Sequence, residues 1–324
     1  MIESSTKAAS TGAIELAEER LQTLLPGIYR GRMNEISPVL MGLAPLVFDV
    51  EGNVEWDRMW GSFCDLAMAG GPPHKGKLLG PGTREDMDAK PETYFKVCEE
   101  IARGIALAAR LQAIPSSEPG WMVVRCKSST MANWMLRAIT MENVSVRRED
   151  ASVLLPVHSC FRLEKEIKNV ITVTAKTTHY WTGHLIRLQQ LAVANLFHQL
   201  ESEAPLLQPE WSPCAFDRDK RRRVEQAIEE STGLAVSEHT YAGWIGLECG
   251  AIASAISSMR RLVANNILSR REHTTVFVPY NSAADPVGQR VAEAVSDLKP
   301  FIVPLARTGK VEQLLENIES TKVV

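Results

Sequence analysis

Residues 120–156 read GWMVVRCKSSTMANWMLRAITMENVSVRREDASVLLP, and residues 243–279 read GWIGLECGAIASAISSMRRLVANNILSRREHTTVFVP, at a constant offset of 123 without a gap. Eleven of the 37 aligned positions are identical, where roughly two would be expected from average residue usage. The identities include the opening Gly-Trp, one cysteine, the Arg-Arg-Glu tripeptide and the closing proline. The sequence therefore predicts two copies of one module.

The patterns inside this stretch predict a strand, a helix and a two-stranded hairpin. Residues 121–126 form an apolar run typical of a strand, and Ser128 or Ser129 is suited to cap the next helix. Two further strands are predicted at residues 144–148 and 153–157, around a short polar turn. With a second helix after each hairpin, the module reads β-α-β-β-α, and we expect an α+β fold of antiparallel sheets covered by helices.

Asn143 and its counterpart Asn266 stand where the helix of each module has to end. Asparagine tolerates the left-handed backbone that closes many helices. A structural role explains why this residue is repeated, without any functional requirement.

A third, degenerate module is predicted at residues 46–118 from the order of its elements, namely a strand at 46–50, a helix at 56–68 and a loop in place of the hairpin. In that alignment His74 would be equivalent to Asp150 and His273 of the two clear copies. The predicted divisions of the chain are 1–45 for an N-terminal helix and connector, 46–118 for the degenerate module, 119–182 for the second module, 183–241 for a helical insertion, 242–305 for the third module and 306–324 for a C-terminal helix.

Outside the modules, periodicity and turn residues predict several further elements. They are a helix at 11–25 with Thr11 as N-cap, a helix at 91–111, a linker at 114–119, helices at 184–200 and 217–232, a helix begun by Asp285 and Pro286, and a helix at 309–320.

Composition limits the classes of function that the chain can have. Its 324 residues are 45% apolar and 23% charged with a formal net charge of −3, which argues against a protein that coats nucleic acid. The cationic run at residues 220–223 is more typical of a solvated helix face. Without a leader segment or an apolar run of 18 residues, a cytosolic protein that does not enter the membrane is expected. The six widely spaced cysteines indicate neither a zinc site nor a disulfide framework.

The Arg-Arg pair of each module is the first candidate for ligand binding. Arg147 and Arg148 recur as Arg270 and Arg271, and a guanidinium can hold a carboxylate or a phosphate through two hydrogen bonds. Successive side chains on a strand point to opposite faces, so at most one arginine of each pair can face a shared ligand, and Arg148 and Arg271 are preferred. Ion pairing within the hairpin is the structural alternative.

Residues 70–82, GGPPHKGKLLGPG, form the second candidate. Glycines such as Gly71 let the backbone approach a ligand closely, while His74 and Lys75 provide groups for proton transfer and Lys77 adds a cation. The spacing matches no nucleotide-binding loop. A purely structural turn is the alternative interpretation.

Two groups of residues contain the ligand types of a metal site. His74, Asp150 and His273 would make a two-His, one-carboxylate set, but their grouping depends on the degenerate module. His179 and His184 are five residues apart, which on a continuous α-helix leaves their side chains about 140° apart and unable to share one ion. A break at Gly183 would change that geometry, and a packed cluster of aromatic and histidine rings is the expected alternative.

Two functions are compatible with these observations. In the first, the chain is a cytosolic enzyme that acts on a small anionic metabolite, a carboxylate or a phosphate, in a cleft between modules, with a reaction type that the sequence leaves open. In the second, it is a non-catalytic binding or assembly protein, for instance a homo-oligomer, built from the duplicated modules. The sequence identifies no cofactor.

Overall fold

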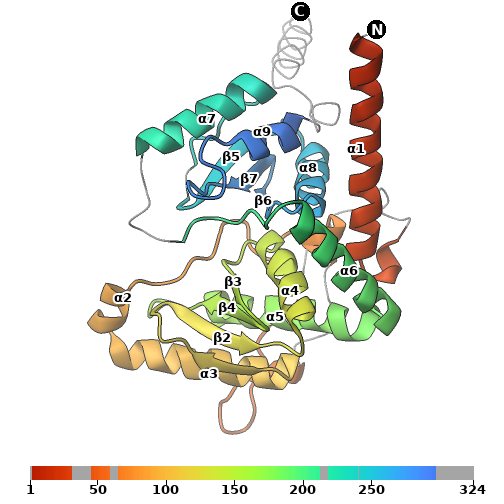
Figure 1. Cartoon of the computed structure of the whole chain (residues 1–324). Helices are drawn as coiled ribbons and strands as arrows, with labels where there is room; N and C mark the ends of the chain where they lie inside the picture. The colour runs from red at the N-terminus through yellow and green to blue at the C-terminus, as the bar shows by residue number, and fades with distance from the viewer. Residues whose placement is uncertain (1, 31–44, 59–64, 212–217, 240, 297–324) are drawn as a thin grey trace, which may run out of the picture. The chain divides into compact units, whose positions relative to one another are not determined.

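The structure is a computed structural model of the chain, and it describes residues 2–30, 45–58, 65–211, 218–239 and 241–296, with side chains from residue 12 onward. These residues form two compact units. Figure 1 shows the chain coloured by residue number from red to blue. The central unit comprises residues 22–199, and the terminal unit comprises residues 1–21 with the described residues from 200 onward. Both contain helices and an antiparallel sheet, so the predicted α+β class is confirmed.

The central unit is built on a sheet with the strand order β1-β2-β4-β3. Its strands are β1 (Gln112–Pro115), β2 (Trp121–Arg125), β3 (Arg147–Glu149) and β4 (Ser152–Pro156). The helices are α2 (Arg84–Ala89), α3 (Pro91–Ala109), α4 (Ser129–Met141) and α5 (Lys168–His179). Helices α3 and α5 lie side by side, and α4 packs on β3, β4 and α5 (Figure 1). The α4 residues Trp134, Met135 and Ile139 are buried completely and form the middle of the core.

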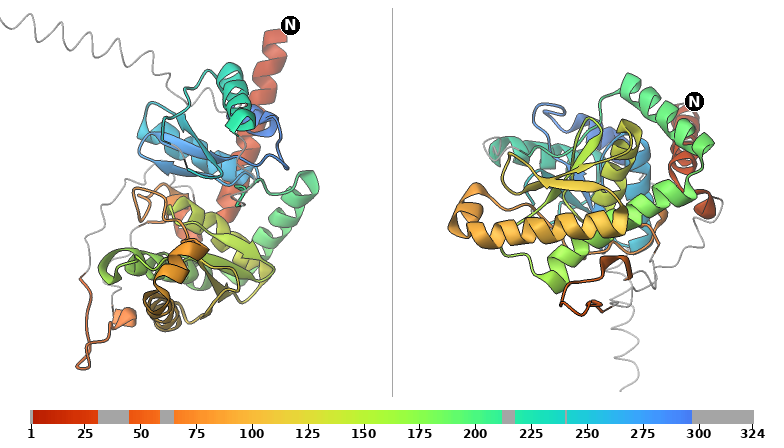
Figure 2. Two further views of the ribbon diagram at one scale, coloured as in Figure 1. Left: turned by 90° about the vertical axis from the view of Figure 1, so that its left-hand side faces the viewer. Right: turned by 90° about the horizontal axis from the view of Figure 1, so that it is seen from below.

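The terminal unit has a smaller sheet with the order β5-β7-β6. Its strands are β5 (Trp244–Glu248), β6 (Arg270–Glu272) and β7 (Thr275–Pro279), and its helices are α7 (Arg218–Thr232), α8 (Ile252–Ala264) and α9 (Gln289–Ser296). Helix α8 packs on β6 and β7, while α7 and α9 pack on each other. Figure 1 labels these elements, and the left view of Figure 2 shows them from a second side. Two long helices, α1 (Ile2–Leu24) and α6 (Arg187–Glu203), each contribute residues to both units.

The two sheets have the same strand register at the same sequence offset. Trp121 pairs with Pro156 in one sheet and Trp244 pairs with Pro279 in the other, and β2, α4, β3 and β4 each have a counterpart that begins and ends 123 residues later in the terminal unit. The left-handed residues recur as well. Asn143 has φ of 59° and Asn266 has 60°, as expected for the asparagine that ends each helix.

An extended segment precedes each sheet, and the sequence comparison did not identify it. Leu79 forms a parallel bridge to Val144, and Leu207 forms the equivalent bridge to Ile267. The two segments read LLGP (78–81) and LLQP (206–209), so they match at an offset of 128 instead of 123. The gapless alignment at an offset of 123 does not place these two segments over each other, so it did not reveal their similarity.

The described residues give no support to the predicted degenerate module. Among the described residues between 45 and 111 the only β pairings are the isolated bridges at Phe48 and Leu79. Residues 46–50 belong to a short hairpin whose tip residue Val50 is fully exposed. Of the helix predicted at 56–68, the described ends are the 3-10 turns Trp56–Arg58 and Ala67–Ala69, and residues 59–64 lie outside the described residues. The KLLG segment aligned with the degenerate hairpin is instead the edge segment that contains Leu79.

Several boundaries outside the modules also differ from prediction. The first helix already runs from Ile2, so Thr11 is not its N-cap. The linker predicted at 114–119 begins with strand β1, which pairs along β2. Helix α9 starts at Gln289, after a turn in which the Asp285 carboxylate accepts hydrogen bonds from the amides of Arg290 and Val291. The connector at 31–44 and the C-terminal helix at 309–320 lie outside the described residues.

Gly120 offers a direct test of the close approach between the backbone at residues 81–82 and the start of β2. Its φ is +85°, and a β-carbon at this position would lie 2.1 Å from the carbonyl oxygen of Gly82. Replacing Gly120 by alanine should therefore destabilise the central unit by about 2–4 kcal/mol, through backbone strain and a clash with the backbone. Urea unfolding followed by tryptophan fluorescence measures the effect. Gly80→Ala is the matched control, because a β-carbon there meets nothing within 4 Å. Equal urea midpoints for the two variants would contradict the close contact between Gly120 and the Gly82 carbonyl.

Candidate functional site

The glycine-rich loop at residues 70–77 is fastened to the C-terminal end of α4. Gly70 has a left-handed backbone with φ of 100°, and a β-carbon on Gly71 would lie 2.6 Å from the Asp65 carbonyl oxygen. The amide of His74 donates to Glu142 Oε2 at 2.9 Å, and Asn143 Nδ2 donates to the carbonyl of Lys75 at 2.9 Å. Glycine is required where the loop turns, and the two residues that end α4 hold the rest of the loop in place.

Glu142 connects three segments that are distant in the sequence. Its Oε1 accepts a hydrogen bond from the Ala67 amide at 3.0 Å and pairs with Lys176 Nζ of α5 at 2.7 Å. The Glu142 and Lys176 side chains are 0% and 1% exposed. A buried carboxylate is stable only when its oxygens are bonded and its charge is paired, and both conditions are met here.

His74 lies on this loop with its Nδ1 buried and without a hydrogen-bond partner among the described residues. Burial, together with the positive charges of Lys176, Lys168 and Lys75 in that order, lowers the pKa of His74 to about 3. The imidazole is therefore neutral at pH 7. The same three lysines that disfavour a proton on His74 favour an anion beside it.

The end of the loop meets a π-helical turn, η4 (Leu163–Ile167), which leads into α5. Lys75 Nζ lies 3.5 Å from Glu166 Oε1, and Arg162 holds both oxygens of the same carboxylate. The hydrogen bonds from Arg162 lower the pKa of Glu166 to about 2. Around the loop, the four cations Lys75, Arg162, Lys168 and Lys176 are accompanied by the three carboxylates Glu142, Glu166 and Asp65, the last of which contacts Gly71. Lys77, also predicted to bind substrate, is exposed.

Asn169 is a second buried polar group near the start of α5, and no pattern in the sequence indicated it. It is 4% exposed, and neither its Oδ1 nor its Nδ2 has a partner among the described residues. It comes directly after Lys168 and precedes Lys176 by seven residues, which places it on the same side of the helix as Lys176. Unpaired buried amides are rare, and they often mark a missing ligand or water.

The four arginines of the predicted binding set are mostly engaged within their own hairpins. Arg147 pairs with Glu149 of its own hairpin at 3.7 Å, pairs with Glu118 outside the hairpin at 2.6 Å, and lies over the Trp121 ring at 5.1 Å. Arg270 is fully buried, pairs with Glu272 at 2.7 Å, and lies over the Trp244 ring at 5.3 Å. These matching contacts support a structural role for the first arginine of each pair.

The second arginine of each pair donates to the carbonyl two residues ahead, Arg148 to Asp150 and Arg271 to His273, both at 3.4 Å. Arg148 is exposed on β3, whereas Arg271 is buried in the terminal unit. Of the two preferred binding residues, Arg148 is therefore the one whose side chain solvent reaches freely.

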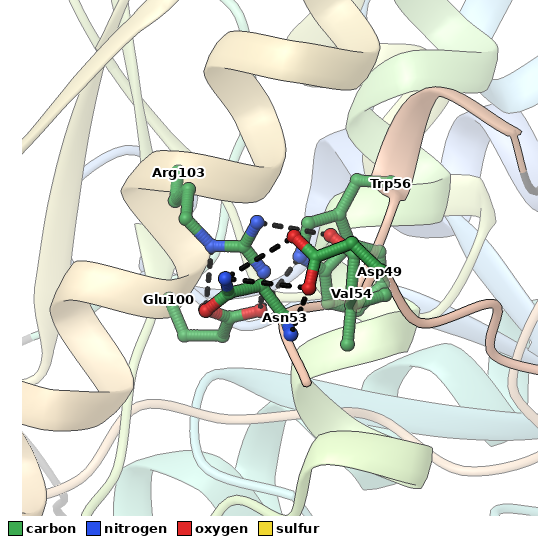
Figure 3. A network of polar contacts seen from close by, with 6 residues as sticks. All are labelled: Asp49, Asn53, Val54, Trp56, Glu100 and Arg103. Atoms are coloured by element: carbon green, nitrogen blue, oxygen red, sulfur yellow. Dashed lines mark hydrogen bonds and ion pairs between the residues drawn. The ribbon is translucent and has the colours of Figure 1, made fainter. Parts of the chain in front are cut away.

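An open pocket of about 370 Å³ is lined in part by Leu163 and Ile167 of η4. Val97 of α3, Phe161 and Ile167 give it an apolar floor, and Lys96 stands at its wall. The hairpin at residues 49–54 closes one side and is held to α3 by the network in Figure 3, in which Glu100 binds both Trp56 and Arg103. Arg103 also donates to the Val54 carbonyl at 2.9 Å. The pocket does not include His74.

His179 and His184 lie next to each other, contrary to the prediction for a continuous α-helix. Residues Tyr180–His184 form a second π-helical turn, η5, in which the Leu185 amide donates to the Tyr180 carbonyl. The two Nε2 atoms are 3.1 Å apart. Burial and the charge of His184 lower the pKa of His179.

The other metal hypothesis receives no support from the geometry. No group of three or more His, Cys, Asp or Glu side chains among the described residues is arranged to hold an ion. Asp150 and His273 occupy the left-handed position of their own hairpin turns, with φ of 47° and 49°, whereas His74 lies on the loop held by Glu142. The local backbone of His74 thus differs from that of Asp150 and His273, and the equivalence predicted for these three residues stays unsupported.

Two further groups named in the sequence analysis, the cysteines and the cationic run, have the following environments. Burial raises the pKa of the Cys126 thiol to about 12 and that of Cys249 to about 11, so neither is a reactive thiolate at neutral pH. In the cationic run at 220–223, Arg221 is buried and donates to the carbonyls of Tyr241 and Trp244.

None of the helices in the described ranges has the length and apolar character needed to cross a membrane.

The ion pair of Glu142 and Lys176 can be tested by a double-mutant cycle. Glu142→Gln leaves an uncompensated buried ammonium, so a loss of about 3–5 kcal/mol of unfolding free energy is expected. Lys176→Met combined with Glu142→Gln should restore a large part of that loss, because no charge remains buried alone. Urea titration of the four proteins measures the coupling. Additive losses in the double variant would show that the two side chains do not act as a pair.

Comparisons with protein-family models, with curated proteins and with solved structures gave no match for this chain. Its function must therefore be inferred from the side chains described above.

Proposed function

We propose that the chain is an enzyme that acts on a small anionic metabolite, a carboxylate or a phosphate, bound beside the His74 loop of the central unit. The observation that carries the proposal is the buried Nδ1 of His74, which lacks a protein partner in the described structure while three lysines act on the ring. A ligand oxygen at this nitrogen would satisfy its hydrogen bond and would be held by the surrounding positive charge.

The positive charges around the loop are the reason to expect a negatively charged ligand. Glu142 offsets Lys176, and Glu166 is shared between Arg162 and Lys75. An anion brought to the loop gains from this field, which is stronger near a partly dry surface than in bulk water. The unpaired amide of Asn169, one residue after Lys168, adds a donor and an acceptor for a polar substituent.

Proton transfer is the chemical role proposed for His74. As a neutral imidazole it can accept a proton, and the charge of a bound anion raises its pKa toward the range in which a histidine exchanges protons at neutral pH. Hydrolysis, elimination and isomerisation are all compatible with such a group. Lys75 on the same loop, the nearby Gly71 and Lys77, and the exposed Arg148 remain the predicted auxiliary residues.

Anion binding is tested with inorganic phosphate and citrate as probes on the full chain. We expect titration calorimetry to detect binding by the wild type, and Lys168→Gln or Lys75→Gln to weaken it at least fivefold, because each removes one positive charge from the field around His74. NMR titration of the His74 ring should show that its pKa rises when phosphate is bound.

Lys90→Gln is the matched control, since Lys90 is exposed at the start of α3 and is not among the groups that act on His74. Equal weakening by Lys90→Gln would indicate a non-specific effect of net charge. Absence of binding to both probes, with an unchanged His74 pKa, would reject the proposed site.

We also infer that the two units carry duplicated copies of one module. Support comes from the identical register of both hairpins at an offset of 123, and from the LLGP and LLQP segments that flank them. The position of Glu142 is occupied by Asn265 in the terminal unit. The proposed anion site would therefore belong to one copy only.

The alternative function, assembly, is favoured by one surface of the central unit. Ile186, Leu188 and Leu191 at the start of α6 are 68%, 74% and 48% exposed, and clustered apolar side chains of this kind often mark a contact between chains. A second copy of the chain is the proposed partner.

If α6 mediates self-association, Leu188→Glu should shift sedimentation toward the monomer, because a carboxylate would be buried in the contact. Leu107→Glu, which changes a singly exposed leucine of α3, should leave the distribution unchanged. A wild-type chain that sediments as a monomer at all concentrations would exclude this function.

A further inference from the structure

The histidine pair at the end of α5 has an arrangement that neither proposed function uses. His179 and His184 present their Nε2 atoms to each other at 3.1 Å, with ring planes inclined by 69°. His179 is exposed and His184 is half-buried. Solvent can therefore reach the space beside the two nitrogens.

The π-helical turn is the cause of this arrangement. In an α-helix, residues five apart point in directions about 140° different, but a π turn closes its hydrogen bonds five residues apart and brings such residues onto one face. The observed bond from the Leu185 amide to the Tyr180 carbonyl, 3.1 Å long, is of this kind. Turns of this type are frequent at functional sites.

Two aromatic residues between the histidines anchor the turn in the core. Tyr180 is buried and its hydroxyl bonds that of Tyr29 at 2.6 Å, while Trp181 is buried with its ring 5.6 Å from that of Trp134. The histidine rings thus extend from a backbone whose position is fixed by the buried side chains of Tyr180 and Trp181. A ligand bound between them would meet a pair of nitrogens that is already in place.

The distance between the nitrogens suits a chelated metal ion. With metal–nitrogen bonds of about 2.05 Å, two nitrogens 3.1 Å apart subtend an angle of about 98° at the metal. This value falls between the right angle of square-planar or octahedral geometry and the tetrahedral angle. Imidazole nitrogens are ligands for copper, nickel and zinc, whereas magnesium and calcium prefer oxygen.

We propose that His179 and His184 form a two-histidine binding site for one divalent transition metal of the copper, nickel and zinc group, with water in the remaining coordination positions. In the metal-free chain one Nε2–H donates to the other Nε2. Metal binding requires both rings to carry their proton on Nδ1, so one ring changes tautomer and no net proton is released.

Metal binding at this site would also stabilise the turn. A metal held by residues at both ends of η5 cross-links the turn, and an ion that binds only the folded chain raises its stability. Tyr29, which bonds Tyr180, also donates to Asp65 Oδ1 at 3.0 Å, next to the backbone on which Gly71 packs. The stabilised turn is thus linked through two tyrosines to the base of the His74 loop.

The test uses the full chain without an affinity tag, stripped with chelator, in a Cys160→Ser background so that the exposed thiol cannot bind the metal. Titration calorimetry with Ni²⁺ and Zn²⁺ should give one metal per chain, and His179→Ala or His184→Ala should each weaken binding at least tenfold. His198→Ala, which removes an exposed histidine of α6, should have no effect. The electron paramagnetic resonance spectrum of the Cu²⁺ form should show two equivalent nitrogen ligands.

Circular dichroism confirms that each variant is folded, and His184→Gln replaces His184→Ala if the latter is not. The proposal is overturned if the double variant lacking both rings binds as tightly as the wild type. It is also overturned if wild-type binding is undetectable at about 1 mM metal, roughly the affinity of a single weak contact, or if the stoichiometry is one metal per two chains.

Discussion

The arrangement of the central unit depends on one buried carboxylate. Glu142 ends helix α4 and binds the amides of Ala67 and His74 as well as the ammonium of Lys176. Three segments that lie far apart in the sequence meet at this group, and none of them could be moved without leaving a charge or an amide unsatisfied in the core. The His74 loop therefore has a fixed position without regular secondary structure of its own.

Features that depend on local sequence could be predicted, and those that depend on distant partners could not. The repeated stretch predicted β2, α4 and the hairpin to within a few residues, because alternation, a serine cap and the left-handed Asn143 act locally. Strand β1 was missed, because its sequence QAIP resembles a linker and it gains its structure by pairing with β2. The Glu142–Lys176 pair and the π turn at His184 leave no periodic signal in the sequence.

The position that follows the helix beside each sheet is occupied differently in the two units. Where the central unit has Glu142, the terminal unit has Asn265, whose side chain contacts Arg20 of α1 at 3.4 Å. Arg20 in turn pairs with Glu203 of α6 at 2.5 Å. The same position after the module helix thus organises a loop in one unit and anchors a helix in the other, although the hairpin registers are unchanged.

The terminal unit is assembled from both sides of the central unit in the sequence, and this has a consequence for synthesis on the ribosome. Residues 22–199 are contiguous and can fold as soon as they emerge, but Ala17 and Leu21 of α1 are buried in the finished protein in a unit that is otherwise made last. At ordinary rates of translation, about 15 to 55 s separate the synthesis of these two residues from that of residue 296, the described end of the terminal unit. During that interval the nascent N-terminal helix is a natural client for a chaperone.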